Sequence, residues 1–265
     1  MTAPILLLGA GRMGGALIRG WSEAGAFGPA DLLIRDPQPS PEALAAAGQG
    51  AALNPPDEAL AAARTVLLAV KPQVWREAAA AYAPLLAADA VIVSILVGVR
   101  VSDIAAGFGG RRVARVMPTT GVAIGKGVAS IHAPDLEALA RAHALFDSVA
   151  TTADLTDEAL MDAASAVSGS APAFVYAFVE ALEAAGVAQG LPEATARTLV
   201  RATLHSASAL LERSGEEPAE LRRQVTSPGG TTQAALGVLM GERGFELLFR
   251  DAVAAAVARA RELAG

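Results

Sequence analysis

The sequence contains no cysteine and is poor in histidine, lysine and aromatic residues. Without cysteine the chain has no disulfide framework, no thiolate nucleophile and no cysteine-based metal site, which fits a reducing cytoplasm. Its three histidines, His132, His143 and His205, fall in no motif, so we expect them to be packing or surface residues rather than catalytic groups. We therefore expect no metal site, and any catalysis must depend on other residue types.

Positive charge is also scarce, since 21 Lys and Arg stand against 27 Asp and Glu, with a net charge of -6 and a pI of about 5.2. Nucleic acids and anionic membranes need a concentrated positive field, so this balance argues against both and favours small-molecule ligands. A charge-free apolar stretch at residues 163–179 is shorter than the roughly 20 residues of a spanning helix, and we interpret it as a buried helix pair. The first eight residues lack the basic start of a signal peptide and are interpreted as a strand.

Short apolar runs alternate with alanine-rich helical stretches in the first half of the chain. Five runs are apolar almost throughout, as in strands that helices cover on both faces: residues 5–8, 32–34, 66–70, 91–94 and 113–116. After about Thr151 only helical patterns follow, separated by glycine and proline. We therefore expect an α/β chain in which an N-terminal Rossmann-type doubly wound sheet, residues 1–152, precedes an all-helical domain, residues 153–265.

The first predicted strand is followed directly by Gly9-Ala10-Gly11-Arg12-Met13-Gly14-Gly15, which opens a helix. Glycines at these positions permit a tight turn and a close approach of the backbone to a pyrophosphate, whose charge the helix N-terminus attracts. The motif thus predicts a dinucleotide site. Its expected cofactor-binding residues are Gly9, Gly11, Arg12, Met13 and Gly14.

Two charged residues, Arg35 and Asp36, stand at the end of the second predicted strand. Asp36 lies 22 residues after Gly14, where an acid binds the ribose of NAD, whereas Arg35 could turn outward and pair with the 2′-phosphate of NADP. The plain structural alternative is an exposed Arg–Asp pair in a turn. We expect NADPH as the cofactor, with NADH as the alternative.

Three further segments combine residue types that suit ligand binding. Ala69-Val70-Lys71-Pro72 ends a predicted strand at the carboxyl edge of the sheet, where open α/β folds bind ligands. Residues 166–174 are mostly small, which serves close helix packing as well as a substrate wall. Residues 224–232 contain a Pro-Gly-Gly turn that opens a helix and presents N–H donors for a carboxylate, with more flanking hydroxyls than an N-cap requires.

Taken together, these segments resemble pyrroline-5-carboxylate reductases, and the resemblance extends over residues 5–263. It implies that Ala69, Val70, Lys71 and Pro72 line the cofactor. It also implies that the turn holds the substrate carboxylate and that Thr232 has the catalytic role of hydrogen-bonding the ring nitrogen. The substrate-binding residues expected from the resemblance are Gln224, Ser227, Gly229, Gly230, Thr231 and Thr232.

Two loops depart from the pattern of this family. Where the family has S-I-A-A-G and M-P-N-T-P, this chain has residues 94–98, S-I-L-V-G, and residues 117–121, M-P-T-T-G. By resemblance both loops border the nicotinamide, which adds Val97, Met117 and Pro118 to the cofactor-binding residues. The larger Leu96 and Val97, together with Thr119 and Gly121, leave open which imine is reduced.

The expected activity is the NAD(P)H-dependent reduction of 1-pyrroline-5-carboxylate to L-proline in the cytoplasm. Alternatives are a reductase of a related cyclic imino acid, a 3-hydroxyacid dehydrogenase and a non-catalytic dinucleotide-binding protein. The dehydrogenase would need a lysine in the second domain as proton donor, and no lysine follows Lys126. Apolar helix faces at residues 174–185 and 248–263 predict a homodimer, and higher oligomers stay open.

Overall fold

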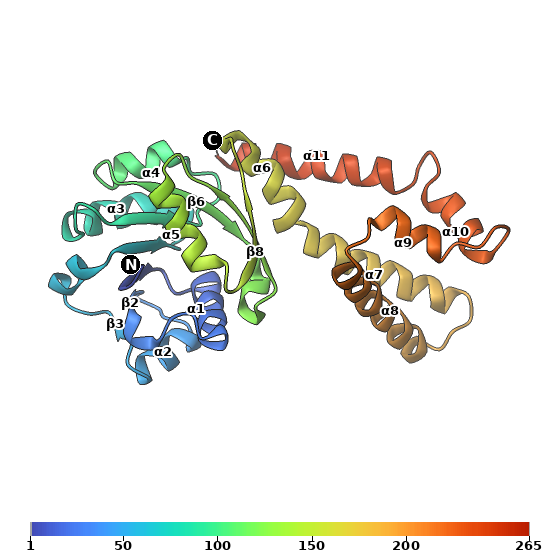
Figure 1. Cartoon of the computed structure of the whole chain (residues 1–265), viewed down its shortest axis with the longest axis horizontal. Coiled ribbons are helices and arrows are strands. Elements are labelled where there is room, and N and C mark those ends of the chain that lie inside the picture. Colours follow the sequence, from blue (N-terminus) through green and yellow to red (C-terminus); the bar gives the residue numbers. More distant parts are fainter. Residues whose placement is uncertain (1, 265) are drawn as a thin grey trace. The chain divides into compact units, whose positions relative to one another are not determined.

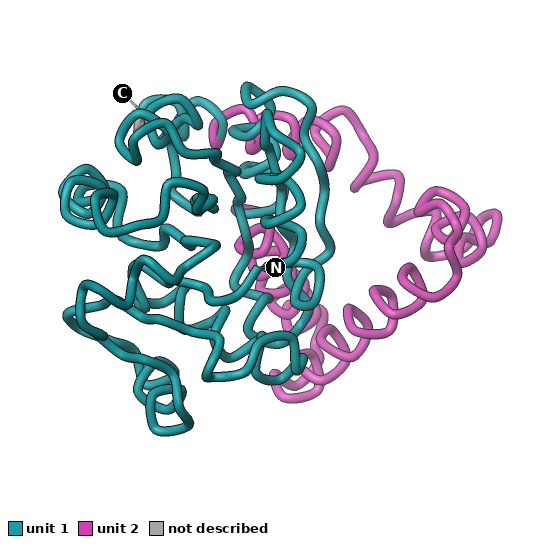
Figure 2. Tube along the Cα trace, turned by 60° about the vertical axis from the view of Figure 1, so that its left-hand side comes forward, with its two compact units in different colours: residues 1–169, 257–265 teal, residues 170–256 magenta. Residues whose placement is uncertain are grey.

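The computed structural model describes residues 2–264. The chain divides into two compact units, Met1–Gly169 with Val257–Gly265, and Ser170–Ala256, which Figure 2 shows in teal and magenta. The first unit is built on one sheet of eight strands in the order β3-β2-β1-β4-β5-β6-β7-β8. Its strands are β1 (Ile5–Leu8), β2 (Leu32–Arg35), β3 (Ala52–Leu53), β4 (Thr65–Leu68), β5 (Val91–Ser94), β6 (Val113–Pro118), β7 (Gly127–His132) and β8 (Ala150–Asp154).

The five apolar runs predicted from the sequence are all strands, and the Rossmann-type sheet is confirmed. The sheet is not wholly parallel, because β6 and β7 pair antiparallel while every other neighbouring pair is parallel. The sequence prediction missed β3, β7 and β8. β3 has two residues, and the sequence of β8, A-T-T-A-D, carries no large apolar side chain. Neither offers the apolar run by which buried strands are recognised.

Helices cover both faces of this sheet (Figure 1). The side chains of β1 alternate between them, since Ile5 and Leu7 pack with α1, α2 and α5 while Leu6 and Leu8 pack with α3 and α4. The helices of this unit are α1 (Arg12–Ala24), α2 (Pro41–Gly48), α3 (Trp75–Tyr82), α4 (Val101–Gly107), α5 (Leu136–Phe146) and α6 (Met161–Ala164). Short 3₁₀ turns are η1 (Pro29–Asp31), η2 (Asp57–Ala62), η3 (Pro72–Val74), η4 (Ala83–Leu85), η5 (Thr120–Ile124) and η6 (Glu158–Leu160), and a π-helical turn is η7 (Ser165–Gly169).

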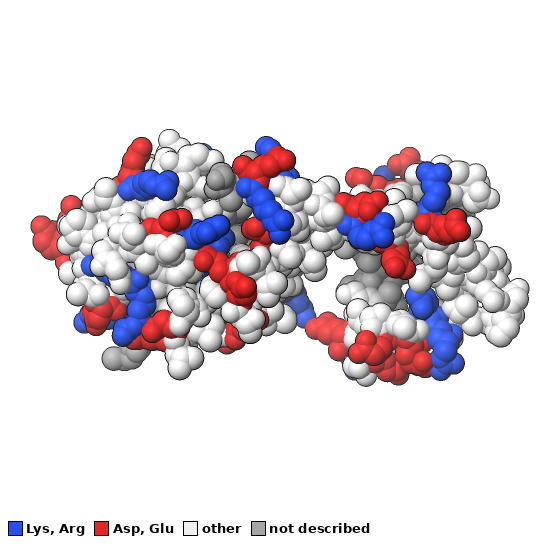
Figure 3. Space-filling view, turned by 90° about the horizontal axis from the view of Figure 1, so that it is seen from above, with Lys and Arg blue, Asp and Glu red and all other residues white. Residues whose placement is uncertain are grey.

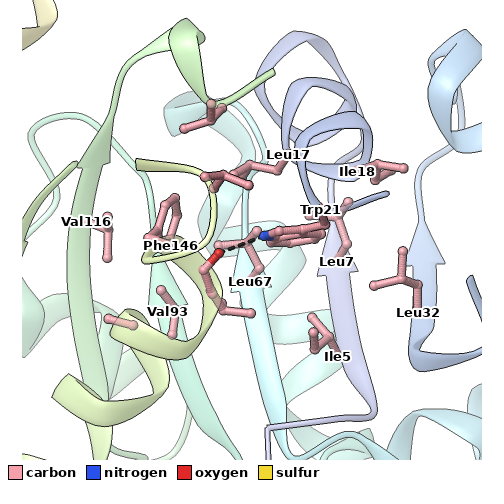
Figure 4. Packing of buried hydrophobic residues seen from close by; sticks show 14 of the residues in the cluster. Ile5, Leu7, Leu17, Ile18, Trp21, Leu32, Leu67, Val93, Val116 and Phe146 are labelled. Atoms are coloured by element: carbon pink, nitrogen blue, oxygen red, sulfur yellow. Dashed lines mark hydrogen bonds between the residues drawn. The ribbon is translucent and has the colours of Figure 1, made fainter. Parts of the chain in front are cut away.

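Trp21 of α1 is at the centre of the core on the α1 face (Figure 4). It is fully buried, its ring meets Phe27 edge to face at 5.5 Å, and its indole N–H donates to the carbonyl of Leu145 at 2.7 Å. The hydrogen bond satisfies the one polar atom of the side chain, so the large apolar ring can be buried without an unpaired donor. It thereby ties α1 to the end of α5 and fixes the helix that follows the glycine loop.

The second unit is helical, as the sequence predicts. Its helices are α7 (Ala171–Ala188), α8 (Glu193–Ser214), α9 (Pro218–Gln224), α10 (Thr231–Leu239) and α11 (Phe245–Ala264), the last of which continues into the first unit. α7 and α8 pack on each other, and Ala196 and Val200 of α8 are buried. The remaining large side chains of α7 stay accessible in the single chain, among them Tyr176 at 67% and Phe178 at 40%.

The interpretation of residues 163–179 as a buried helix pair is wrong for the single chain, because α7 buries none of its residues there. The run Glu158–Ala188 is long and apolar enough to cross a membrane by length and composition alone, a test that helices of soluble proteins also pass. Ser165 and Ser168 within it donate to the carbonyls of Met161 and Ala164, four residues earlier. What this helix lacks within one chain is a covering surface.

Candidate functional site

The glycine loop joins β1 to α1 at the carboxyl edge of the sheet. Gly9 has a φ of +94°, and a Cβ there would lie 2.7 Å from the backbone of Ala69, so only glycine fits. A Cβ on Gly14 would press against the carbonyl oxygen of Gly9. Around Gly11, in contrast, a Cβ would meet nothing within 4 Å among the described residues. The loop is therefore packed tightly on its inner side and open at Gly11, as a backbone that approaches a pyrophosphate must be.

Hydrogen bonds join this loop to the neighbouring strand ends. The Asp36 carboxylate accepts from the N–H of Ala10 at 2.5 Å and from that of Gln38 at 2.7 Å. The Gly9 N–H donates to the Arg35 carbonyl, and the Ala69 N–H donates to the Leu8 carbonyl. The structure thus brings Gly9, Asp36 and Ala69 together, as expected for a dinucleotide site. Asp36 also has a structural task, because it holds the loop in place.

Asn54, which the sequence interpretation missed, belongs to this edge as well. Its side-chain N–H donates to the Asp36 carbonyl at 3.0 Å, and its carbonyl oxygen accepts from the Asp36 N–H at 3.1 Å. Its φ of +47° is a left-handed conformation that asparagine tolerates better than most residues. The sequence feature that could have indicated Asn54 is its position directly after β3, but this strand has only two residues and was not recognised.

Arg35 does not project freely into solvent. Its guanidinium donates to the carboxylate of Asp57 and lies over the ring of Tyr82, 5.9 Å from the ring centroid, so that only 17% of the side chain is exposed. Its Nε is buried and has no hydrogen-bond partner among the residues that the structure describes. Asp57 and Tyr82 thus hold the Arg35 side chain in this conformation, and its pairing with a 2′-phosphate stays a prediction.

The other expected cofactor residues lie around the same sheet edge. Lys71 is exposed at the start of η3, and Arg12 is exposed in the first turn of α1, where Met13 packs partly against the core. Met117 and Pro118 end β6. In the loop after β5, Val97 is 47% exposed, but Leu96 is 2% exposed within the core cluster on the α4 face. The core thus accommodates the side chain of Leu96, whereas that of Val97 stays accessible.

The second group of expected residues forms the turn between α9 and α10. Gly229 has a φ of +71°, the Gly230 N–H donates to the Ser227 carbonyl at 3.0 Å, and α10 begins at Thr231. The hydroxyls of Ser227, Thr231 and Thr232 make no hydrogen bond with other described residues, and no side chain caps α10. The first N–H groups of a helix lack partners within it, so free donors gather at this turn. We refer to residues 227–232 as the anion turn.

Two glutamines flank the anion turn. The Gly229 N–H donates to the side-chain oxygen of Gln233 at 2.5 Å, so one donor of the turn is in use. Gln224 donates to Glu216 at 2.6 Å and to Glu220 at 3.2 Å, which directs its amide to α9 rather than to the turn. The hydrogen bond from Arg223 lowers the pKa of the Glu220 carboxyl, with a smaller effect of Gln224 in the same direction. Glu220 is therefore a stable acceptor for Gln224 at neutral pH.

The two groups of expected site residues belong to different compact units. Those for the cofactor lie in Met1–Gly169, and those of the anion turn lie in Ser170–Ala256. On the face shown in Figure 3, Lys and Arg are interspersed with Asp and Glu over both units. Among the described residues no group of three or more His, Cys, Asp or Glu is arranged to hold a metal ion. The chemistry available is that of hydroxyl and backbone N–H donors in the second unit and of a dinucleotide loop in the first unit.

Comparison with known proteins gives matches in both units. Residues 158–263 match the family model of pyrroline-5-carboxylate reductase dimerisation, and residues 4–98 match that of the coenzyme F420-dependent NADP oxidoreductases. The chain is 38% identical to the pyrroline-5-carboxylate reductase of Pseudomonas aeruginosa, with 99% of this chain and 97% of the relative covered. It is 34% identical to that of Synechocystis, with 99% of each chain covered. The crystal structure of Plasmodium falciparum pyrroline carboxylate reductase with NADP bound matches with a TM-score of 0.83 at 25% identity, with 99% of this chain and 98% of that chain covered.

Proposed function

The chain belongs to the pyrroline-5-carboxylate reductase family, and from this premise we propose how its residues hold the two reactants. The enzyme is an NADPH-dependent oxidoreductase that reduces 1-pyrroline-5-carboxylate to L-proline. Relatives with this activity match it over nearly their whole length. The roles of individual residues below are our proposal.

The observation that carries the proposal is the anion turn with its unpaired donors. The substrate carries a carboxylate beside its ring nitrogen, and free N–H groups at the start of α10 are suited to such an anion. We assign the carboxylate to the turn formed by Ser227, Gly229, Gly230 and Thr231. The N–H groups of Gly229 and Gly230 already have partners, so the hydroxyls of Ser227 and Thr231 are the donors proposed for it. Gln224 is a weaker candidate for direct contact, since its amide already donates to two glutamates.

Thr232 is assigned to the ring nitrogen. Thr232 is half-buried, and its hydroxyl makes no hydrogen bond with the described residues, so it is available for the substrate. An imine that is protonated at nitrogen already accepts hydride well, and the protein needs chiefly to orient it and exclude water. A neutral hydroxyl suffices for this task, which agrees with the lack of a histidine motif or a second-domain lysine.

The glycine loop fits a dinucleotide. Close packing at Gly9 and Gly14 and open space at Gly11 leave the backbone accessible where the pyrophosphate would pass. The chemistry that NADPH supplies when bound is a hydride for the imine carbon. We propose that Arg12, Met13, Asp36, Lys71, Val97, Met117 and Pro118 complete its site.

We further propose that the partner in the oligomer is a second copy of this chain, seated on the helical domain, residues 153–265, while residues 1–152 hold the cofactor. Support comes from the dimerisation model that residues 158–263 match and from the uncovered apolar residues of α7. Burial of such a face is the usual reason for a homodimer. A cytoplasmic location is proposed from the cysteine-free sequence.

The role of Thr232 is tested with Thr232→Val, which keeps the shape and removes the hydroxyl. A hydrogen bond to a charged group contributes about 1.5–3 kcal/mol, so kcat/KM for the imine should fall roughly 10- to 100-fold while the Kd of NADPH stays the same. Thr198→Val is the matched control, because the Thr198 hydroxyl is exposed on α8 and donates to the Ala194 carbonyl. If Thr232→Val kept the full kcat/KM, the assignment would be wrong.

A further inference from the structure

Arg35, the last residue of β2, is held from two sides by residues that come much later in the chain. Asp57, the first residue of η2, accepts a hydrogen bond from its Nη2, and Tyr82, the last residue of α3, lies under its guanidinium. Asp57 itself is 60% exposed. The guanidinium thus has one carboxylate partner already in place.

Arg35 is also the one basic residue of the segment from β2 to the end of α2, residues 32–48. In this fold the end of β2 is where the 2′-position of the cofactor is distinguished, by an acid for a hydroxyl or by an arginine for a phosphate. Asp36 cannot rotate freely toward a ribose, since its carboxylate accepts from Ala10 and Gln38. The positive charge that the protein offers to a 2′-phosphate therefore depends chiefly on Arg35 and on the group that neutralises Arg35.

We propose that Asp57 sets the preference between NADPH and NADH by offsetting the charge of Arg35. The proposal rests on the assignment of the glycine loop and the β2 end to the cofactor. A 2′-phosphate must share the guanidinium with the Asp57 carboxylate and is repelled by it, whereas a 2′-hydroxyl is not. Asp57 thereby reduces the advantage of the phosphorylated cofactor below what an unpaired arginine would give, and Tyr82 keeps the guanidinium in place.

The test measures binding of two cofactor fragments, 2′,5′-ADP and 5′-AMP, by titration calorimetry in the absence of substrate. Asp57→Asn removes one negative charge without changing the size of the side chain. We expect 2′,5′-ADP to bind about three- to tenfold more tightly, with the Kd of 5′-AMP unchanged within twofold. An unchanged ratio of the two affinities, or a weaker binding of 2′,5′-ADP, would overturn the proposal.

Two further variants identify the cause. Asp89→Asn removes the same charge from an exposed ion pair with Arg64 at the amino edge of the sheet, and it should leave both affinities unaltered. In an Arg35→Gln background the effect of Asp57→Asn on 2′,5′-ADP should disappear, because Asp57 acts through Arg35. A full effect in that background would contradict the mechanism. If the asparagine still accepts a hydrogen bond from Arg35, the measurement is repeated with Asp57→Ala.

Turnover separates this inference from the proposed function. If the wild-type enzyme reduces the imine with NADPH and with NADH while Asp57→Asn leaves the fragment ratio unchanged, only the role of Asp57 fails. If neither fragment binds to the wild-type protein and Gly11→Ala has no effect on the cofactor, the cofactor assignment itself fails.

Discussion

Replacing Gly11 by alanine should weaken cofactor binding without weakening the fold. The φ of Gly11 is -73°, outside the left-handed region that favours glycine, and a Cβ there meets no described atom within 4 Å. The added methyl group would project into the space assigned to the pyrophosphate. We therefore expect this one change to weaken binding while it leaves stability nearly unaltered.

The magnitudes can be estimated from this environment. Alanine lowers the entropy of the unfolded chain, which stabilises by about 0.4–1 kcal/mol, and it is a poorer helix N-cap than glycine by a similar amount. The free energy of unfolding should thus change by less than about 0.5 kcal/mol. The Kd of NADPH should rise at least about tenfold, equivalent to about 1.4 kcal/mol, since the methyl group separates the backbone from the phosphate.

Gly14→Ala is the contrasting variant. Its Cβ would press against the Gly9 carbonyl oxygen, a backbone atom that cannot move without distorting the loop. We expect a loss of about 2 kcal/mol or more in stability together with weaker binding. The assays are thermal and urea denaturation and NADPH fluorescence. Wild-type NADPH affinity in Gly11→Ala would refute the proposed path of the pyrophosphate.

Two further predictions concern stability. Trp21→Phe leaves the Leu145 carbonyl without its 2.7 Å donor and opens a cavity. The free energy of unfolding, measured by denaturation, should therefore fall by about 2–3 kcal/mol. A loss below about 0.5 kcal/mol would contradict the role of Trp21 in the core. Hydrogen bonds to Asp147 and then to Asp154 raise the pKa of His143, so its stabilising contribution is complete below the unfolded value near 6.5 and disappears as the pH rises through the higher folded value. Melting curves are compared at the two ends of a pH range that extends roughly one to two units to either side of 6.5. The His143→Gln variant should be less stable than the wild type by roughly 0.2–1 kcal/mol at the acid end only. An equal loss of stability at both ends would disprove the link between the His143 charge and stability.

The sequence predicted the parallel core of the sheet because these strands are buried on both faces and apolar almost throughout. It did not predict β7, whose sequence mixes Gly127, Ser130 and His132 with apolar residues, or the edge strand β8. The helix α7 is apolar enough to be interpreted as buried, yet its cover is missing from the single chain. Periodicity reports that a face is apolar and does not identify what lies against it.

The anion turn could be predicted because its residues are consecutive, so their order alone carries the pattern. The environment of Arg35 could not, since Asp57 and Tyr82 reach it only through the folding of η2 and α3. The same holds for Leu96, whose size suggested a changed pocket although its side chain lies in the core with Ile104 and Phe108. Local motifs thus predict where the ligands bind, while the charge and shape around these positions required the tertiary structure.

The most direct test of the central claim is the oxidation of NADPH by the purified enzyme on addition of 1-pyrroline-5-carboxylate, with L-proline measured as product. The same assay includes the six-membered-ring imino acid and a 3-hydroxy acid with NADP⁺. The account predicts the highest kcat/KM with the five-membered ring and stoichiometric L-proline. A higher kcat/KM with either other compound, or NADPH binding without turnover, would contradict it.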